Sequence, residues 1–545
     1  MPVDAPLKFA GRAAPAAGRT AHAMLRDAGF ALLLLLPLLW GLGQAPLFDV
    51  DEGAFAEATR EMLAGGDYLH TTLNGEPRFD KPIGVYWLQA ASVASFGLNE
   101  FALRLPSALS IWAMALALCV FIAPRYGRRT AMFSGLLLVS SIGMVAIARA
   151  ATADALLNLL LALAGLDLWR FLGSGEDRNA LRRTYLWVGL GLLVKGPVVV
   201  LVPGAAGLLW CATGRQWQRM RIALTDWRAW TILLAVAVPW YAYAWNRHGM
   251  DFVNGFIMKH NLGRYGSTME SHGGGLLYYV AIVPLLVLPW TPLLAAVLGR
   301  LRTGWRTDPL FRYLAGWAGF VFVFFTFSAT KLPHYVLYGS APAVLLCAHS
   351  AAAADTRMQR WLLATYVLAV TLLLALPLVL VGYADALSHP VFGPLARAAA
   401  VPHGMLAGGL LLLALTIASH GLRAGFPARY GTLLLLFALW FVHAIVPWWA
   451  DVLQGPVKAA GLKARQLGKA AVQWKLHRPS LAVYQQAPAP RRAPQPGELA
   501  LVALGKAPGL AGFDILSERG GIALVRRRRT PDDPVLASGS GTPTP

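Results

Sequence analysis

Long apolar runs recur along the whole sequence and restrict the folds that it can adopt. A helix needs roughly 20 mostly apolar residues to cross a bilayer. Only 14% of the residues are charged and 57% are hydrophobic, whereas soluble proteins average about 25% charged residues. The sequence therefore predicts an all-α polytopic membrane protein. We expect 13 transmembrane helices, at about 29–47, 103–123, 131–148, 153–172, 184–195, 197–212, 229–246, 276–298, 312–328, 332–350, 360–382, 403–420 and 430–449.

The distribution of Lys and Arg predicts the orientation of these helices. With a cytoplasmic N-terminus, the N-terminal arm and the inner loops hold 23 Lys and Arg, and the outer loops hold 11. Basic residues concentrate in cytoplasmic loops, and an odd number of spans then places the C-terminus outside. This predicts a cytoplasmic arm (1–28), a membrane domain (29–449), a small outer α/β domain (450–529) and a disordered tail (530–545). The expected strands of the α/β domain are 471–476, 481–484, 499–504, 513–517 and 522–525.

The first outer loop, residues 48–102, is long and acidic. It carries nine of the 27 Asp and Glu residues, and long structured loops are usually functional. Helical spacing over 51–63 places Phe55, Ala58 and Met62 on one face, and the aromatic segment 82–96 predicts an interfacial helix. Asp49, Asp51 and Glu52 open this loop at the membrane edge. One acid there is explained by capping of the 51–63 helix, but a cluster favours catalysis, with a carboxylate as general base or as partner of a cationic sugar.

Further candidate site residues lie at other outer ends. Asp154 follows Arg149 in a short turn, where it either forms a local Arg–Asp pair and caps the next helix or faces the first loop. Cations from separate segments suggest an anionic lipid substrate, since ionisable groups at membrane depth mark functional sites; the alternative is unrelated membrane anchors. These candidates are Lys81, Lys195, Arg264, Lys331 and His334, with Tyr335 next to them.

Two other classes of ligand receive little support from the sequence. His248, Asp251, His260, Glu270 and His272 could bind a divalent metal, but their spacing matches no standard metal site, and we expect no cofactor. The net charge of +21 does not predict nucleic-acid binding, because the basic residues lie in cytoplasmic loops and in the outer domain. The basic residues of the outer domain either attract anionic lipid headgroups or are those of an ordinary basic domain.

Several segments resemble one family of polytopic glycosyltransferases, the lipid A aminoarabinose transferases, which are related to the protein O-mannosyltransferases. The resemblance covers roughly residues 30–350 and implies a GT-C fold. It implies an undecaprenyl-phosphate sugar as donor in the bacterial inner membrane, Asp51 and Asp154 as essential carboxylates, and Lys81, Arg264 and Tyr335 as phosphate ligands. Glu52 and His334 are neighbouring motif positions. The segments that carry the resemblance are LFDVDEGAFAEATREMLAGGDYLHTTLNGEPRFDKPIGVYWLQ, FGLNEFALRLPSAL, RAATADALL, VKGPVVVLVPG, HNLGRY and FSATKLPHYVLYGSAPAVLL.

The function that this resemblance implies is transfer of a sugar, such as 4-amino-4-deoxy-L-arabinose, to lipid A on the periplasmic face. A second hypothesis keeps the chemistry but changes the acceptor to a protein Ser/Thr or another envelope glycan. A third is a lipid-linked sugar transporter or flippase. Transporters place charges at the bilayer midplane and often contain repeated halves, whereas here the charges gather at the outer ends and no repeat is visible.

Overall fold

The computed structural model describes residues 21–263, 273–507 and 509–529. Most of the predicted arm, the predicted tail and Arg264 therefore lie outside the described residues. Seven helices in the described part are long and apolar enough to cross a membrane, and a bent pair, Trp217–Thr225 with Trp227–His260, gives an eighth. The chain is thus a helical, multi-span membrane protein. All 13 predicted segments fall largely on helices, but many of these are short or bent, so the count of 13 crossings stays a prediction.

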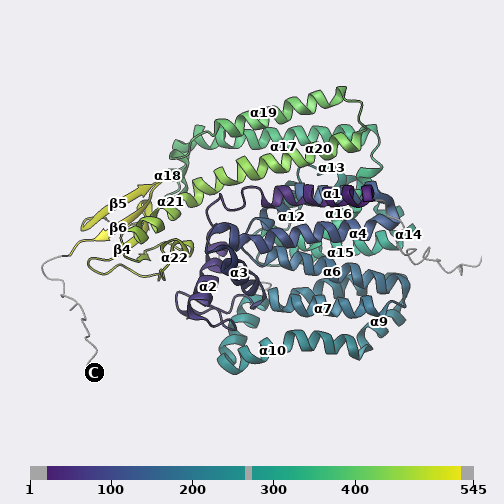
Figure 1. Ribbon diagram of the computed structural model, residues 1–545, viewed down its shortest axis with the longest axis horizontal. Coiled ribbons are helices and arrows are strands. Elements are labelled where there is room, and N and C mark those ends of the chain that lie inside the picture. The colour runs from purple at the N-terminus through teal and green to yellow at the C-terminus, as the bar shows by residue number, and fades with distance from the viewer. Residues whose placement is uncertain (1–20, 264–272, 508, 530–545) are drawn as a thin grey trace, which may run out of the picture.

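The N-terminal half of the membrane domain is a bundle of helices packed side by side (Figure 1). Gly127 breaks α4 with a φ of +80°, between two of the predicted spans. This is a conformation that glycine adopts without steric cost, so α4 holds two helical segments joined at a kink. The helices of this half are α1 (Ala21–Leu39), α4 (Glu100–Ser140), α5 (Ile142–Ala148), α6 (Asp154–Ser174), α7 (Arg178–Lys195), α8 (Val198–Gly214), α9 (Trp217–Thr225), α10 (Trp227–Phe252) and the π-helix η1 (Val253–Gly263).

The following helices complete the bundle and add a second hydrophobic cluster. α17, α19 and α20 lie along one edge of the molecule (Figure 1) and bury Tyr366, Phe437 and Trp440 among themselves. The elements are α12 (Tyr278–Leu286), α13 (Pro292–Gly299), α14 (Leu301–Thr307), α15 (Pro309–Thr326), the 3₁₀ helix η2 (Pro333–Gly339), α16 (Ser340–Ala352), α17 (Thr356–Gly382), η3 (Ala384–Ala386), α18 (Phe392–Arg397), α19 (His403–Ala418), η4 (Ser419–Gly421), α20 (Phe426–Trp440) and η5 (Phe441–Ile445).

The first loop is a folded cap at one end of the bundle. It contains α2 (Asp51–Gly65), the hairpin of β1 (Thr72–Leu73) and β2 (Glu76–Pro77), and α3 (Gly84–Phe96). Both helices predicted in this loop are confirmed. Phe55, Ala58 and Met62 are all buried, as their spacing on one helix face predicts.

The C-terminal unit is a small α/β structure that lies beside this cap (Figure 1). Its sheet has the order β3-β4-β6-β5; β3 and β4 are parallel and the other pairs are antiparallel. Four predicted strands are found, but the expected strand 481–484 is wrong, because this segment forms α22. A buried run of four apolar residues has no period that separates a strand from a helix. The elements are α21 (Val446–Gln466), β3 (Ala471–Gln473), α22 (Ser480–Gln485), β4 (Leu499–Ala503), η6 (Leu504–Lys506), β5 (Phe513–Arg519) and β6 (Ile522–Arg527).

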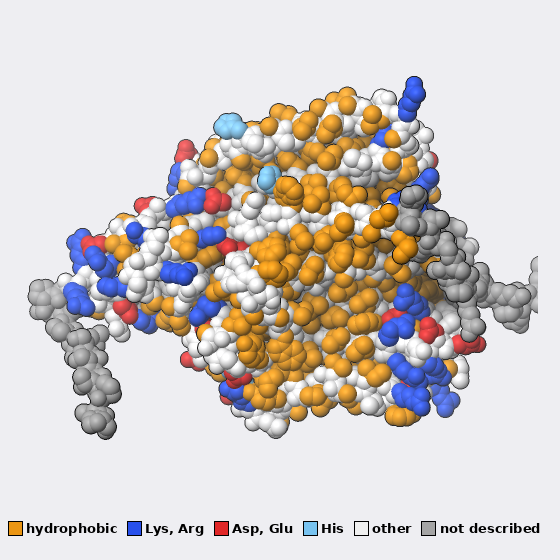
Figure 2. All heavy atoms as spheres, in the orientation of Figure 1, with side chains coloured by type: hydrophobic (Ala, Val, Ile, Leu, Met, Phe, Trp, Pro, Cys, Tyr) orange, Lys and Arg blue, Asp and Glu red, His pale blue; other side chains and the backbone are white. Residues whose placement is uncertain are grey.

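The surface separates into an apolar belt and two charged ends. Figure 2 shows hydrophobic side chains across the middle of the face in view and Lys and Arg gathered at both ends. The cap and the C-terminal unit lie at one end, and α9 and α14, which carry Arg-rich segments, lie at the other (Figure 1). This is the arrangement expected of a protein whose two ends face water on opposite sides of a bilayer.

Candidate active site

An ion pair between Asp154 and Lys195 lies at the cap end of the bundle. Asp154 begins α6 and Lys195 ends α7. Each charge is therefore opposite in sign to the partial charge of the helix dipole at that end and is stabilised by it. Lys195 Nζ is 2.5 Å from Asp154 Oδ1. The Tyr338 hydroxyl donates a hydrogen bond to the same oxygen at 3.1 Å, and His334 Nε2 lies 3.7 Å from it. Asp154 is only 7% exposed, so it is a buried carboxylate held by three side chains from distant segments.

Aromatic rings form one wall beside this pair. The ammonium of Lys195 lies 5.6 Å from the ring centre of Tyr335 and 5.4 Å from that of Tyr338. Cations are attracted to aromatic faces at such distances. Both rings come from η2, which follows Lys331. The segment 331–338 therefore reaches the ion pair through His334, Tyr335 and Tyr338.

Lys81 and Asp80 approach the site from the first loop. Asp80 Oδ1 lies 2.7 Å from His260 Nε2, and Asp80 Oδ2 lies 3.4 Å from Arg78. Burial opposes ionisation of Asp80, but the hydrogen bond from His260 and the charges of Arg78 and Lys81 outweigh it and hold the pKa of Asp80 well below its usual range. Lys81 donates to the Asp80 carbonyl at 2.9 Å and is close enough to interact electrostatically with Asp154.

Asp51 faces solvent at the start of α2. Its charge, like that of Lys81, acts on His334. The structure therefore brings Asp51, Lys81, Asp154, Lys195 and His334 to one end of the bundle. Such an arrangement of exposed carboxylate, buried carboxylate and cations can hold a phosphate and stabilise charge that develops at a neighbouring carbon.

Lys331 makes a different set of contacts. Its ammonium donates to the carbonyls of Thr326 at 2.6 Å and Ser328 at 2.7 Å. Thr326 is the last residue of α15, so Lys331 satisfies carbonyls at a helix C-terminus. Arg264, the remaining predicted cation, lies outside the described residues.

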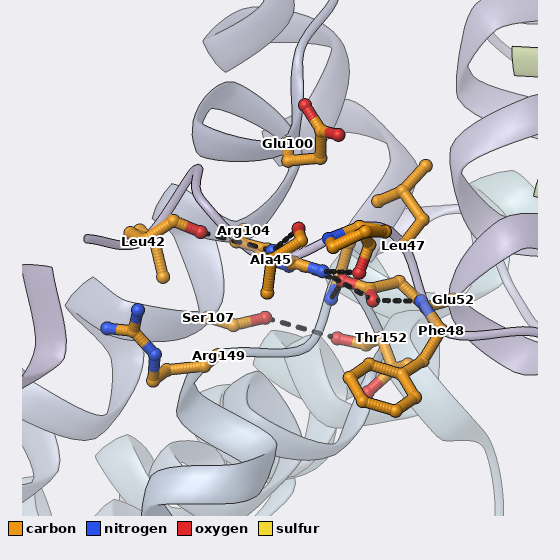
Figure 3. A network of polar contacts seen from close by, with 12 residues as sticks. Leu42, Ala45, Leu47, Phe48, Glu52, Glu100, Arg104, Ser107, Arg149 and Thr152 are labelled. Carbon is orange, nitrogen blue, oxygen red and sulfur yellow. Dashed lines mark hydrogen bonds and ion pairs between the residues drawn. The ribbon is translucent and has the colours of Figure 1, made fainter. Parts of the chain in front are cut away.

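Glu52 is part of a buried network with Arg104 (Figure 3). The two side chains are joined by two hydrogen bonds, at 2.7 and 2.9 Å, and Glu52 also accepts from the Phe48 and Ala151 amides at 2.7 and 2.8 Å. Arg104 donates further to three backbone carbonyls, those of Leu42, Ala45 and Pro46. Both side chains are 2% exposed. The network ties the start of α2 to the turn before Asp154.

Two arginines within or beside apolar runs mark buried polar contacts, although the sequence does not show which groups they contact. Arg104 is a cation within an apolar run, which is costly without a partner, and Arg149 is another at a span end. The expected alternative of a local Arg149–Asp154 pair is wrong. Arg149 instead donates to the Gly41 carbonyl at 2.7 Å and to the Leu38 carbonyl at 3.3 Å, because it lies against the end of α1.

Asp49 connects the cap to the C-terminal unit. Its carboxylate accepts hydrogen bonds from the amide of Ser480 at 2.9 Å and from its hydroxyl at 2.6 Å. Burial raises the pKa of Asp49 to about 7, although these hydrogen bonds and the charge of Arg478 act in the opposite direction. The acid cluster marked Asp49 in the sequence, but nothing there marked Ser480.

The proposed metal-ligand set is not assembled in the described residues. Within 21–263, 273–507 and 509–529, no group of three or more His, Cys, Asp or Glu side chains could hold a metal ion. His248 Nε2 lies 3.0 Å from His70 Nδ1, and His260 bonds Asp80. Glu270 and His272 lie outside this part of the chain.

Comparison with known proteins concerns the family and the fold. Residues 80–243 match the family model described as dolichyl-phosphate-mannose-protein mannosyltransferase. The crystal structure of ArnT from Cupriavidus metallidurans bound to undecaprenyl phosphate matches with a TM-score of 0.78, over 92% of this chain and 98% of that one, at 21% identity. The chain has the fold of ArnT. The same protein in the apo state also has a TM-score of 0.78.

Curated relatives support the likeness to ArnT in sequence. The undecaprenyl phosphate-alpha-4-amino-4-deoxy-L-arabinose arabinosyl transferase of Shewanella sediminis is 30% identical over 336 residues, 58% of each chain. The protein named arabinosyl transferase 2 of Sodalis glossinidius is 32% identical over 344 residues, 60% of this chain and 59% of that one. The matches thus span a little under two thirds of these relatives. The predicted resemblance to the aminoarabinose transferases is confirmed.

Proposed function

We propose that this protein is an inner-membrane glycosyltransferase that moves a sugar from undecaprenyl phosphate to lipid A on the periplasmic face. The observation that carries the proposal is the Asp154–Lys195 pair beside Lys81 and Asp51, in a chain with the ArnT fold. The sugar is 4-amino-4-deoxy-L-arabinose or a close analogue, because the relatives are named for that donor.

Lys81, Arg264 and Tyr335 are assigned to the donor phosphate, with Lys195 and His334 next to them. Two of the first three are cations, and the Tyr335 hydroxyl can donate a hydrogen bond. Lys331 supports the site indirectly, because its ammonium already binds two carbonyls. Balancing the charge of the leaving phosphate in this way needs no metal ion.

The reaction breaks the bond between the sugar anomeric carbon and the donor phosphate oxygen and forms a bond from that carbon to an acceptor oxygen, with inversion. If the acceptor is a lipid A phosphate, it is already anionic, and Asp51 orients the sugar or balances its charge. If the acceptor is a hydroxyl, Asp51 takes its proton. Asp154 stabilises positive charge on the sugar ring. Glu52 is assigned a positioning role, because both of its oxygens are occupied by Arg104 and backbone amides.

The membrane arrangement that accompanies this function has 13 spans within 29–449. The arm 1–28 lies in the cytoplasm, and the cap 48–102, the C-terminal unit 450–529 and the tail 530–545 lie in the periplasm. The cap and the C-terminal unit share one end of the bundle (Figure 1), opposite the Arg-rich segments, which supports this orientation. A C-terminal reporter that is active only in the cytoplasm would contradict it.

Mass spectrometry of lipid A tests the function. Cells that express the protein should contain lipid A that carries one added amino-pentose, and cells that express Asp51→Asn at equal membrane level should not. Glu76→Gln is the matched control, since Glu76 is an exposed carboxylate of the same loop. Unmodified lipid A together with newly glycosylated protein would support the second acceptor hypothesis, which the mannosyltransferase family model favours. Full activity in Asp51→Asn would remove Asp51 from the mechanism.

A further inference from the structure

A cavity lies at the end of the bundle opposite the proposed active site. Its volume is about 350 Å³, and it is enclosed by the end of α13, by α14, α15 and α16 and by the kink of α4. Figure 1 shows α14 at the opposite end from the cap. Its polar lining consists of Tyr126, Arg300, Thr303, Thr307, Asp308 and His349.

The negative charge in this cavity is already paired. Asp308 lies 2.9 Å from Arg125, accepts a hydrogen bond from the Tyr126 hydroxyl at 2.5 Å, and caps the amide of Leu310 at 2.9 Å. Through these three contacts, Asp308 joins α4 to the start of α15. Asp308 is therefore not left to neutralise a second cation.

Among the described residues, no carboxylate pairs with Arg300, the cation that lines this cavity. Within the described ranges, its side-chain contact is to His349, with Nη2 3.4 Å from Nε2. An anion beside both groups would accept hydrogen bonds from the N–H donors of the Arg300 guanidinium, and from His349 Nε2 in the tautomer that carries the proton there. Charge-assisted hydrogen bonds of this kind, especially from Arg to phosphate, are the strong ones.

The remaining walls suit the region where a lipid headgroup meets its acyl chains. Phe311, Leu314, Leu345 and Leu346 line the apolar side of the cavity. Arg302 and Arg306 are exposed on the neighbouring face of α14, and they add positive charge that attracts anionic membrane surfaces. Basic pockets between transmembrane helices near one membrane face are suited to anionic headgroups.

We propose that this cavity binds the phosphodiester headgroup of an anionic membrane lipid, with Arg300 and His349 as its ligands. The bound lipid joins α14 to α16 at the face of the membrane opposite the transferase site. The proposal does not depend on the transferase activity, because it needs only a chain that spans a membrane. It assigns a role to a pocket that the sugar-transfer chemistry does not use.

Thermal unfolding of the purified full-length protein in a neutral detergent tests the proposal. Dioleoylphosphatidylglycerol should raise the Tm of the wild-type protein, whereas dioleoylphosphatidylcholine and inorganic phosphate should not. Arg300→Ala should raise the phosphatidylglycerol concentration needed for half of the shift by about tenfold or more, the loss expected for one hydrogen bond to a charged group. Arg302→Ala is the matched control, because it removes the same charge from α14 but does not line the cavity.

A second variant separates the cavity from its charge. Thr303→Trp fills the cavity from the exposed face of α14 and keeps Arg300, so it should abolish the phosphatidylglycerol shift without unfolding the bundle. Equal shifts in Arg300→Ala and Arg302→Ala would overturn the proposal. Stabilisation by phosphatidylcholine, or by inorganic phosphate alone, would also overturn it.

Discussion

Ser480 holds both carboxylate oxygens of Asp49, at 2.9 Å from its amide and 2.6 Å from its hydroxyl. Asp49 lies two positions before the proposed catalytic Asp51. Gly53, on the next turn, leaves no room for a Cβ, which would lie 2.6 Å from the Ser480 nitrogen. The C-terminal unit therefore contributes directly to the position of the catalytic loop.

Ser480→Ala should lower the rate of sugar transfer markedly and the stability of the protein only slightly. It removes one hydrogen bond to a charged or titrating group, worth about 1.5–3 kcal/mol, and leaves the amide contact in place. We expect a kcat about tenfold below wild type at saturating donor, with the same membrane level. Ser517→Ala, in β5 of the same unit, is the control. Equal kcat values for all three proteins would show that the contact does not position Asp51.

Asp49 should make stability depend on pH near neutrality. Its pKa is raised to about 7 from 3.8, so the folded state binds more protons than the unfolded state between these values. Its contribution is therefore fully present below about pH 3.8 and is lost as the pH rises through 7. From pH 5.5 to 7 the loss is about 1.6 kcal/mol, because Asp49 is still half protonated at pH 7 in the folded state. Asp49→Asn should flatten the wild-type fall in Tm over this range, and an unchanged slope would contradict the assignment.

Asp154→Asn should destabilise the protein and abolish transfer. It leaves the ammonium of Lys195 without its carboxylate, and breaking a buried pair in this way costs roughly 3–5 kcal/mol. The double variant Asp154→Asn/Lys195→Met should regain much of the lost Tm, because no uncompensated charge remains. It should not regain activity. Recovery of transfer in the double variant would show that the pair is only structural.

Lys81→Ala and Lys331→Ala should separate donor binding from support of the fold. Lys81→Ala removes a proposed phosphate ligand and should lower kcat/KM for the polyprenyl-phosphate sugar by about 10- to 150-fold, more than Tyr335→Phe does. Lys331→Ala leaves the Thr326 and Ser328 carbonyls without their donor, so its main effect should be a lower Tm. Donor titrations and unfolding curves on both purified variants check this. Unchanged donor kinetics in Lys81→Ala would refute its role.

Local patterns predicted the helices and the residue types of the site. Apolar runs located the bundle, and helical spacing located α2 with Phe55, Ala58 and Met62 on its buried face. The acid cluster and the lysines predicted to be external point to one end of the bundle, and the structure brings Asp51, Lys81 and Asp154 together there. The sequence located four strands of the C-terminal unit, whereas α21 (Val446–Gln466) runs across the expected boundary between 449 and 450. The division into domains therefore stays a prediction.

The partners of the charged residues could not be predicted in the same way. Asp154 pairs with Lys195, 41 residues away, and Glu52 with Arg104, 52 residues away. Periodicity describes the faces of one element, whereas these contacts depend on how elements pack. For the same reason, the hydrogen bonds between Glu52 and Arg104 and the contact of Arg149 with α1 could be seen only in the structure.

The contact between Asp49 and Ser480 joins positions 431 residues apart. During translation, the cap is made early and Ser480 emerges only after the membrane helices have been synthesised. Until Ser480 has been made and has folded against the cap, Asp49 lacks both of these hydrogen bonds. We therefore expect a chain truncated after the membrane helices to insert into the membrane but to transfer the sugar more slowly than the full chain.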